Sequence, residues 1–330
     1  MSKTIAHGIG GGETEIASPR DAWKKHVLLP LLAATALTLP TAANAQKVGL
    51  SMANQDTFLA YMSDALLAEA KKVGADVQME VAGDDVGKQL SQIQNFIAQR
   101  VEAIIVNPVD TDVTPRITKL VTAAKIPLIY VNRRPADFEK LPAGVAWVAS
   151  DENVSGTLET QEVCRVMKGK GNIVVLMGEL SNEAARSRTK DIENVLATAE
   201  CSGIKILDKR EGKWQRTAGN DITTNWLSNG MKFDAIISNN DEMAIGAIQA
   251  LKAAKKWRPD FMVAGIDATP DALASMKAGD LKVTVFQNAA GQGMGSLDAA
   301  IKLIKKQSVD RFVNIPFELV TPANVSKYAK

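Results

Sequence analysis

The sequence predicts an α/β fold of two similar lobes, each built on a parallel sheet with helices on both faces. From Gln46 onward, short β-branched runs alternate with longer amphipathic runs, and glycine or proline stands at the joints. An internal repeat divides the chain into two comparable halves. Alternation of strands and helices is typical of parallel sheets covered on both sides.

The strands are predicted from short apolar runs bounded by turn residues, and the helices from apolar positions three or four residues apart. The predicted strands are 47–53, 77–81, 103–106, 128–131, 145–149, 173–177, 204–209, 235–238, 262–266 and 283–286. The predicted helices are 58–73, 86–99, 113–124, 153–167, 184–199, 217–227, 243–254 and 291–305.

The repeat is clearest at two strands. Segment 102–107 (EAIIVN) recurs as segment 234–239 (DAIISN), and each copy is followed by an acidic turn, a helix, a proline-bearing joint and another strand. The likeness continues through the helix into the next strand, which favours two related lobes over chance similarity of two ordinary parallel strands.

The first 45 residues are predicted to be a secretory signal peptide. Lys24 and Lys25 precede an apolar run over 27–39, which ends in the small-residue site Ala43-Asn44-Ala45. Cleavage is expected before Gln46, and the run is too short to span a bilayer. A buried N-terminal helix is the alternative. Because many residues precede the apolar run, either the leader is long or translation starts after Met1.

Composition restricts the chemistry of the mature chain. Both histidines, His7 and His26, lie in the leader, so the mature chain lacks the commonest general base and imidazole metal ligand. Cys164 and Cys201 remain, either as a disulfide or as buried thiols. Lys and Arg total 39 against 37 Asp and Glu, and this balance gives no electrostatic reason to expect nucleic acid or an anionic membrane as partner.

Polar side chains follow nearly every predicted strand. In open parallel sheets, ligands bind beyond the carboxyl ends of the strands. Amides both donate and accept hydrogen bonds, carboxylates accept them and arginine donates in a planar fork, so such groups suit a ligand with many hydroxyls. The candidates are Gln55, Phe58, Asn107, Asn132, Arg133, Arg188, Trp214, Asn240, Asp267 and Gln287.

Phe58 and Trp214, one in each half, are expected to enclose the apolar face of a sugar ring. The alternative interpretation is that the Asn and Asp residues only cap helices or form turns, and that Phe58 packs on its own helix. The glycines of segment 291–295 (GQGMG) lack the strand context and the phosphate-binding lysine of a nucleotide site, so we expect no cofactor, no metal and no catalytic residue.

Four segments resemble the ribose-binding protein group of periplasmic sugar receptors: 107–112 (NPVDTD), 184–188 (AARSR), 240–247 (NDEMAIGA) and 265–271 (GIDATPD). The resemblance covers essentially the whole mature chain. It implies the type I periplasmic binding protein fold, with two Rossmann-like lobes joined by a three-segment hinge. The implied lobes are 46–149 with 288–315, and 150–287 with 316–330.

The resemblance also implies that the ten candidates above bind the ligand. Three departures from the ribose receptors stand out: Asn132 replaces an aspartate, and Thr57 and Ile266 replace phenylalanines. The stretches 131–135 (VNRRP) and 285–288 (VFQN) look most like receptors of this group that bind myo-inositol. Myo-inositol is therefore the first expectation for the ligand, and ribose or a hexose is the alternative.

By the same resemblance, we expect a monomeric receptor in the periplasm of a Gram-negative bacterium. It would close on its ligand and deliver it to an ABC permease in the inner membrane, or signal to a chemoreceptor. Two other classes are weaker. The leader occupies the place of the DNA-binding segment of a repressor, and a glycosidase would need paired carboxylates, for which Asp56 and Asp267 are candidates.

Overall fold

The computed structural model describes residues 45–328, so all of the predicted leader except Ala45 lies outside the described residues. The first lobe contains a six-stranded sheet in the order β11-β5-β4-β3-β1-β2, and every pair in it is parallel. Its strands are β1 (Lys47–Met52), β2 (Asp76–Val81), β3 (Ala103–Val106), β4 (Leu128–Val131), β5 (Val145–Ala149) and β11 (Phe312–Asn314).

The second lobe repeats this arrangement. Its four-stranded parallel sheet has the order β7-β6-β8-β9, which matches β2-β1-β3-β4 of the first lobe. The strands are β6 (Lys170–Met177), β7 (Gly203–Glu211), β8 (Ala235–Ser238) and β9 (Met262–Ala264). The matching order agrees with the internal repeat, and the predicted α/β fold of two lobes with parallel sheets is confirmed.

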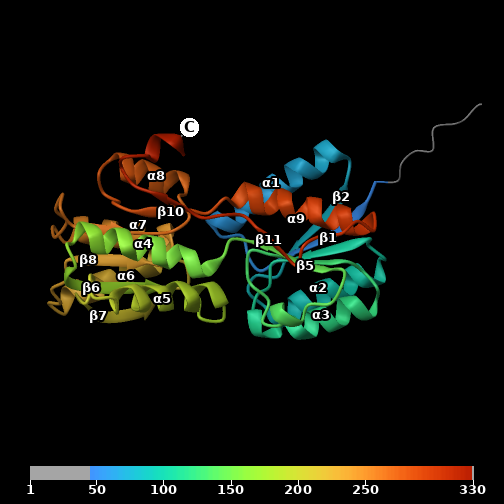
Figure 1. The fold of residues 1–330 in the computed structure, drawn as a ribbon, viewed down its shortest axis with the longest axis horizontal. Helices are drawn as coiled ribbons and strands as arrows, with labels where there is room; N and C mark the ends of the chain where they lie inside the picture. The colour runs from blue at the N-terminus through green and yellow to red at the C-terminus, as the bar shows by residue number, and fades with distance from the viewer. Residues whose placement is uncertain (1–44, 329–330) are drawn as a thin grey trace, which may run out of the picture. The chain divides into compact units, whose positions relative to one another are not determined.

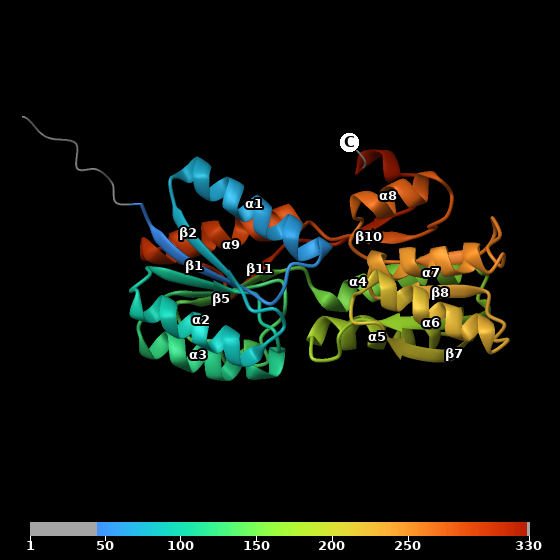
Figure 2. The same ribbon diagram turned by 180° about the vertical axis from the view of Figure 1, so that it is seen from behind.

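Helices cover both faces of each sheet. In the first lobe, α1 packs beside α9, and α2 and α3 lie on the other face (Figures 1 and 2). In the second lobe, α4 packs on α5 and α6 packs on α7. The bounds are α1 (Thr57–Val73), α2 (Val86–Ala98), α3 (Thr114–Ala123), α4 (Glu152–Val166), α5 (Glu183–Leu196), α6 (Arg216–Ser228), α7 (Asp241–Ala253) and α9 (Ala289–Ile304).

The apolar runs were recognisable as strands because both of their faces are buried. In β3, Ala103 and Ile105 belong to the core beneath α1 and α9, whereas Ile104 and Val106 belong to the core beneath α2 and α3. Successive side chains of a strand point to opposite faces, so a central strand covered on both sides needs an uninterrupted apolar sequence. Burying each such side chain stabilises the fold by about 1.5–3 kcal/mol.

Three short elements were not predicted: α8 (Pro270–Lys277), β11 and β12 (Glu318–Val320). β12 pairs antiparallel with β10 (Thr284–Phe286), so one pair departs from the expected parallel arrangement. Isolated parallel bridges, Ala264 with Val283 and Asp267 with Phe286, connect β10 to the edge of the second sheet. Three-residue strands carry too little pattern to be recognised without their distant partners.

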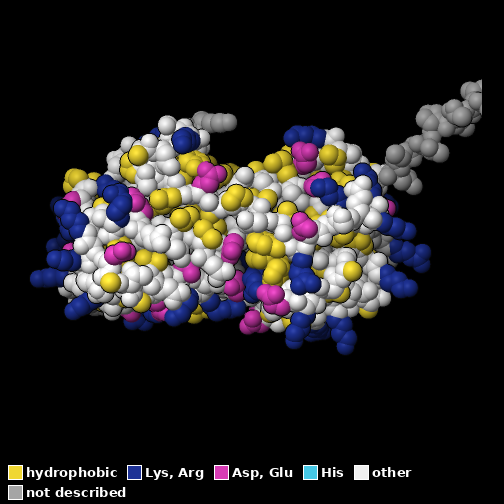
Figure 3. All heavy atoms as spheres, viewed as in Figure 1, with side chains coloured by type: hydrophobic (Ala, Val, Ile, Leu, Met, Phe, Trp, Pro, Cys, Tyr) yellow, Lys and Arg dark blue, Asp and Glu magenta, His cyan; other side chains and the backbone are white. Residues whose placement is uncertain are grey.

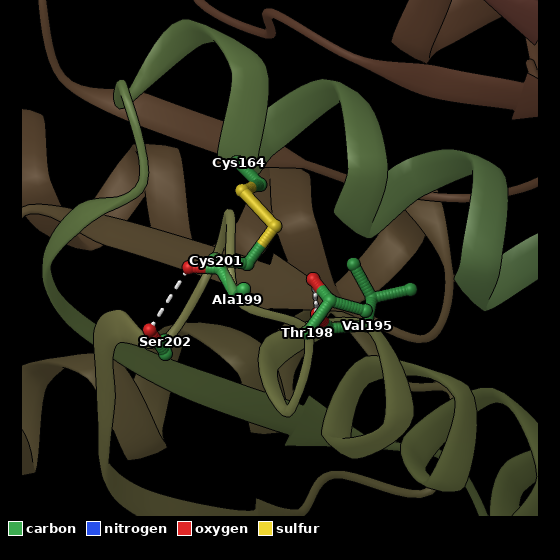
Figure 4. The surroundings of a disulfide bond; sticks show 6 residues. All are labelled: Cys164, Val195, Thr198, Ala199, Cys201 and Ser202. Carbon is green, nitrogen blue, oxygen red and sulfur yellow. Dashed lines mark hydrogen bonds between the residues drawn. A yellow bond between two sulfur atoms is a disulfide. The ribbon is translucent and has the colours of Figure 1, made fainter.

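Cys164 of α4 and Cys201, which lies between α5 and β7, form a disulfide (Figure 4). Their Cα atoms are 5.7 Å apart, which lies in the usual range for a disulfide. Of the two alternatives that the sequence left open, the structure has the disulfide. The bond ties α4 to the segment that enters the edge strand β7.

Positive and negative side chains are interspersed over the visible surface (Figure 3). This agrees with the balanced composition. None of the helices in the described part of the chain combines the length and the apolar character needed to cross a membrane.

Candidate functional site

A pocket lies at the carboxyl ends of the strands, and residues of both lobes line it. About 470 Å³ of space not filled by protein atoms lies within it, including solvent at its mouth. The lining residues are Asp56, Thr57, Phe58, Leu59, Asn132, Arg133, Asn182, Ala184, Arg188, Trp214, Asn240, Glu242, Asp267 and Gln287. Eight of the ten predicted candidates are therefore brought together.

The other two candidates, Gln55 and Asn107, do not line this pocket. Asn107 is fully buried: its Oδ1 accepts a hydrogen bond from the Ala53 backbone N–H (3.4 Å) and its Nδ2 donates to the Val131 carbonyl (3.2 Å). Asn239, the equivalent residue of the repeat, accepts from the Gly178 N–H at 3.0 Å. The repeated asparagine thus joins neighbouring strand ends in each lobe. Gln55 is exposed, and its Nε2 donates to Ser63 Oγ.

Arg188 is the central cation on the second-lobe side of the pocket. Its Nε and one terminal nitrogen donate to the two oxygens of Glu152, both at 2.8 Å, and both side chains are only 4% exposed. The same guanidinium donates to the Asn239 carbonyl at 2.7 Å and to Gln287 Oε1 at 3.2 Å. Burial lowers the pKa of Arg188, but the charge and hydrogen bonds of Glu152, together with the charges of Asp267 and Glu159, outweigh it and raise the pKa above its ordinary value.

Asp267 presents a buried carboxylate to the pocket. It lies 3.9 Å from the nearest guanidinium nitrogen of Arg188, which is too long for a hydrogen bond, because Arg188 is already paired with Glu152. Burial raises the pKa of Asp267 well above its ordinary value, with Arg188 opposing the shift. This carboxylate accepts no side-chain hydrogen bond within the described residues, so its oxygens are available to a ligand.

Arg133 and Asp56 form the charged part of the first-lobe wall. One terminal nitrogen of Arg133 donates to the carbonyls of Pro108 (2.8 Å) and Val109 (3.0 Å). Burial lowers the pKa of Arg133, and the negative charge of Asp56 opposes that shift. Asp56 also accepts from the Leu59 N–H at 2.8 Å and so caps α1. The helix-cap interpretation of the strand-end residues is therefore correct for Asp56, which nevertheless lines the pocket.

Trp214 forms an aromatic wall, and its position depends on its neighbours. Gly178 lies directly under the ring, where a Cβ atom would come within 3.0 Å of three ring carbons. Asn240 Nδ2 donates to the Trp214 carbonyl at 3.2 Å, while Asn240 Oδ1 accepts from the Met243 N–H and caps α7. Asn240 is therefore both a helix cap and a lining residue.

Three lining residues have backbones in the left-handed region that side chains rarely adopt: Asn132 (φ 66°), Trp214 (φ 66°) and Asp267 (φ 124°). Such backbones cost about 1–3 kcal/mol each and cluster at functional sites. The strain here coincides with residues that line one pocket.

Three buried donors in the pocket wall have no hydrogen-bond partner among the described residues. They are Arg133 Nε, Trp214 Nε1 and Gln287 Nε2. A buried donor without a partner costs about 1–3 kcal/mol. Most buried polar groups are paired, so a group of unpaired donors that line one cavity indicates a place where a ligand supplies acceptors.

The two lobes also meet at the rim of the pocket. Thr111 Oγ1 donates to the Ser181 carbonyl at 3.2 Å and accepts from Arg186 at 3.3 Å. Arg186 lies 3.5 Å from Asp112 in an exposed ion pair. These contacts join the segment after β3 to α5 and to the loop before it, and so link the first lobe to the second.

Sequence reasoning missed Asn182 and Glu242 in the lining, and Glu152 behind it. Asn182 directly precedes α5 and caps it through its side-chain oxygen, a position that pattern alone assigns to capping. Glu242 stands next to the recognised Asn240. Glu152 lies at the start of α4, distant in sequence from Arg188, so no local pattern connects the two. Among the described residues, no cluster of His, Cys, Asp and Glu is arranged to hold a metal ion.

Residues 48–308 match the family model described as a periplasmic binding protein domain. A Rhizobium meliloti protein, provisionally named for rhizopine binding, is 56% identical over 89% of this chain and 96% of its own length.

Two solved structures share the fold. A Bacillus halodurans ABC-transporter solute-binding protein with bound myo-inositol is 40% identical, covers 88% of this chain and 99% of its own, and has a TM-score of 0.82. A Caulobacter myo-inositol binding protein is 27% identical, covers 86% of this chain and 95% of its own, and has a TM-score of 0.80.

These matches are binding proteins, which confirms the prediction that the chain is a binding protein and not an enzyme. Asp56 and Asp267 do line the same pocket, but a receptor for hydroxyl groups uses such acceptors equally. The match extends over most of the chain, through both lobes, and places the protein in the periplasm. The chain therefore belongs to the periplasmic binding protein family.

Proposed function

We propose that this protein binds a cyclic polyol or monosaccharide in the pocket between its lobes, with myo-inositol as the first candidate and ribose or a hexose as the second. The observation that carries the proposal is the set of unpaired buried donors, Arg133 Nε, Trp214 Nε1 and Gln287 Nε2, in a wall that also holds the carboxylate of Asp267.

A polyol fits this wall because each hydroxyl accepts and donates at once. Its oxygens would accept from the three donors, and its O–H groups would donate to Asp267. The ring of Trp214 offers an apolar face to the C–H side of the ligand. An apolar ligand would leave all of these groups unpaired. A ligand with only acceptors would leave Asp267 without a donor.

The choice of myo-inositol is supported by the Bacillus structure, which holds that ligand at 40% identity to this chain. The likeness of segments 131–135 and 285–288 to myo-inositol receptors points the same way. Rhizopine, for which the relative at 56% identity is named, belongs in the same tests.

The residues proposed to contact the ligand are Phe58, Asn132, Arg133, Arg188, Trp214, Asn240, Asp267 and Gln287. Gln55 and Asn107 are proposed to support the wall from outside it. We propose lobes of 46–149 with 288–315, and of 150–287 with 316–330, which rotate about the three segments that join them. Each lobe supplies part of the hydrogen bonds, so the ligand would favour the closed form by its differential affinity for it.

In the proposed cellular role, residues 1–45 are a signal peptide cleaved before Gln46, and the mature protein acts as a monomer. It delivers its ligand to an ABC permease in the inner membrane, or signals to a chemoreceptor. Expression of the full chain, followed by mass measurement of the protein from the periplasmic fraction, tests the leader: a mass that still includes Lys24 and Lys25 would contradict cleavage at that site.

The direct test is thermal unfolding of the purified protein with myo-inositol, rhizopine, ribose and hexoses. A ligand at 100 times its Kd adds about 2.7 kcal/mol to the free energy of unfolding, which corresponds to an increase in Tm of roughly 5–11 °C for a protein of this size class. An increase with myo-inositol is expected. An increase in Tm with only ribose or a hexose would show that this sugar, and not myo-inositol, is the ligand. No increase in Tm with any polyol would contradict the proposal.

A further inference from the structure

The side-chain amide of Asn132 belongs to a chain of buried hydrogen bonds that runs out of the pocket. Asn132 Nδ2 donates to Gln292 Oε1 at 3.1 Å, and Gln292 Nε2 donates to Ser150 Oγ at 3.0 Å. Gln292 of α9 and Ser150, between β5 and α4, are fully buried, and neither lines the pocket.

The backbone of Asn132 is fixed on both sides. Its N–H donates to the Val148 carbonyl at 2.9 Å, and its carbonyl accepts from Trp147 Nε1 at 3.3 Å. The orientation of the amide is then the remaining variable. With Nδ2 turned towards Gln292, the oxygen Oδ1 is the group left for the pocket, and it accepts no hydrogen bond from the described residues.

We propose that Gln292 is a specificity-determining positioning residue: it holds the amide of Asn132 so that the pocket presents a hydrogen-bond acceptor there. This inference rests on the proposed function. The ligand must then carry a hydroxyl that donates to Asn132 Oδ1. Asn132 stands where the ribose receptors carry aspartate, and this orientation lets a neutral amide perform as an acceptor.

The direction of this chain of hydrogen bonds follows the orientation of the Gln292 amide, because the Ser150 hydroxyl can both accept and donate. Because Ser150 Oγ accepts from Gln292 Nε2, the oxygen of Gln292 faces Asn132. Reversal would turn Gln292 Nε2 towards Asn132 Oδ1 and leave Asn132 Nδ2 for the pocket as a donor. Loss of either link therefore allows both orientations, and the pocket would discriminate less between donating and accepting ligand groups.

The test compares binding of myo-inositol with binding of its monodeoxy-monofluoro analogues by calorimetry. Fluorine is similar in size to a hydroxyl but cannot donate a hydrogen bond. In the wild-type protein we expect fluorine to weaken binding by about tenfold or more at the ring positions whose hydroxyls donate to Asp267 or to Asn132 Oδ1. In the variant Asn132→Gly, the glycine suits the positive φ of this position. At the ring position that faces Asn132, fluorine should no longer weaken binding in this variant, and this identifies the position.

In Gln292→Met, which replaces the amide by an apolar chain of similar length, the penalty for fluorine at that position is expected to fall at least about threefold. Gln92→Met is the matched control: Gln92 is a buried glutamine of α2 whose Oε1 accepts from Ser51 Oγ, and it lies outside this pocket. In Gln92→Met, fluorine at that position should weaken binding as much as in the wild type. If Gln292→Met weakens all analogues equally and leaves their ratios unchanged, Gln292 has only a structural role and the inference is wrong.

Neutron diffraction from crystals of the deuterated, unliganded protein provides a test that needs no ligand. The amide deuterons of Asn132 are expected to point at Gln292 Oε1. Deuterons of Gln292 that point at Asn132 would overturn the inference. Failure of the inositols, ribose and hexoses alike to bind would instead contradict the proposed function, and the neutron result would then decide the orientation independently.

Discussion

Replacing Gly178 by alanine is expected to displace the Trp214 ring from the pocket wall. The new Cβ would come within 3.0 Å of three ring carbons, a separation that real Cβ atoms essentially never show. The ring is 9% exposed and packs in the core of the second lobe, so it cannot simply swing into solvent without loss of buried contacts. The substitution therefore acts on the pocket through the position of one ring.

The magnitude follows from two separate effects. Overpacking a well-filled site costs about 1–3 kcal/mol, which corresponds to a decrease in Tm of roughly 2–12 °C for a chain of this size class. Loss of the aromatic face removes about 0.5–1.5 kcal/mol of ligand contact, so affinity should fall about two- to twelvefold. Thermal unfolding measures the first effect and calorimetry with myo-inositol measures the second.

Gly87→Ala is the matched control. Gly87 lies in the first turn of α2, and the nearest atom to its Cβ would be Asp85 Oδ1 at 3.2 Å, the tip of an exposed side chain. Alanine is favoured over glycine in a helix, but its Cβ must displace the Asp85 oxygen that caps α2. We therefore expect unchanged affinity and only a small change in Tm. If Gly178→Ala bound as tightly as the wild type at unchanged Tm, the role assigned to the Trp214 wall would be refuted.

Three further predictions concern the rim, the disulfide and pH. Arg186→Ala removes the contacts with Thr111 and Asp112, so the ligand should dissociate a few times faster in stopped-flow measurements. An unchanged dissociation rate would show that these contacts between the lobes do not stabilise the closed form. The disulfide closes a loop of 37 residues, so replacing both of its cysteines should lower the free energy of unfolding by about 4 kcal/mol on the chain-entropy model. Denaturant unfolding measures this change. A loss below about 1 kcal/mol would contradict the estimate. Because burial raises the pKa of Asp267, affinity for a polyol should fall as the pH is lowered through that raised pKa, since the protonated carboxyl loses an acceptor. The contribution of Asp267 to stability without ligand has the opposite trend, decreasing as the pH rises through the raised pKa, because the folded state binds the proton more tightly than the unfolded chain. Calorimetry over the pH range in which the protein stays folded measures this, and constant or rising affinity towards low pH would contradict the role of Asp267.

The sequence predicted the central strands well because burial on both faces imposes an uninterrupted apolar run. The limits of β3, β4, β5 and β8 agree with the predicted ranges. The strands that were missed, β11 and β12, are three residues long, and each pairs with a strand far away in the sequence. Local pattern carries no information about such pairing.

The pocket was predicted from the position of polar residues at strand ends, and this worked for groups such as Arg133 and Asp267. It was less informative for Asn107, because an asparagine that follows a strand can either face a ligand or join two strand ends. The partners that orient the lining, Glu152 and Gln292, lie far in sequence from the residues they hold. Their roles depend on side-chain geometry and not on spacing.

The most direct test of the central claim is calorimetric titration of myo-inositol into the purified protein and into its Asp267→Ala variant. Asp267 is a buried pocket carboxylate that lies 3.9 Å from Arg188 and accepts no side-chain hydrogen bond from the described residues. Its loss should cost about 2–4 kcal/mol of binding, in the range found for interface hot spots. The proposed function predicts one site per chain in the wild type and a loss of affinity of about 30-fold or more in the variant. Equal affinity in both proteins, or no binding in the wild type, would contradict it.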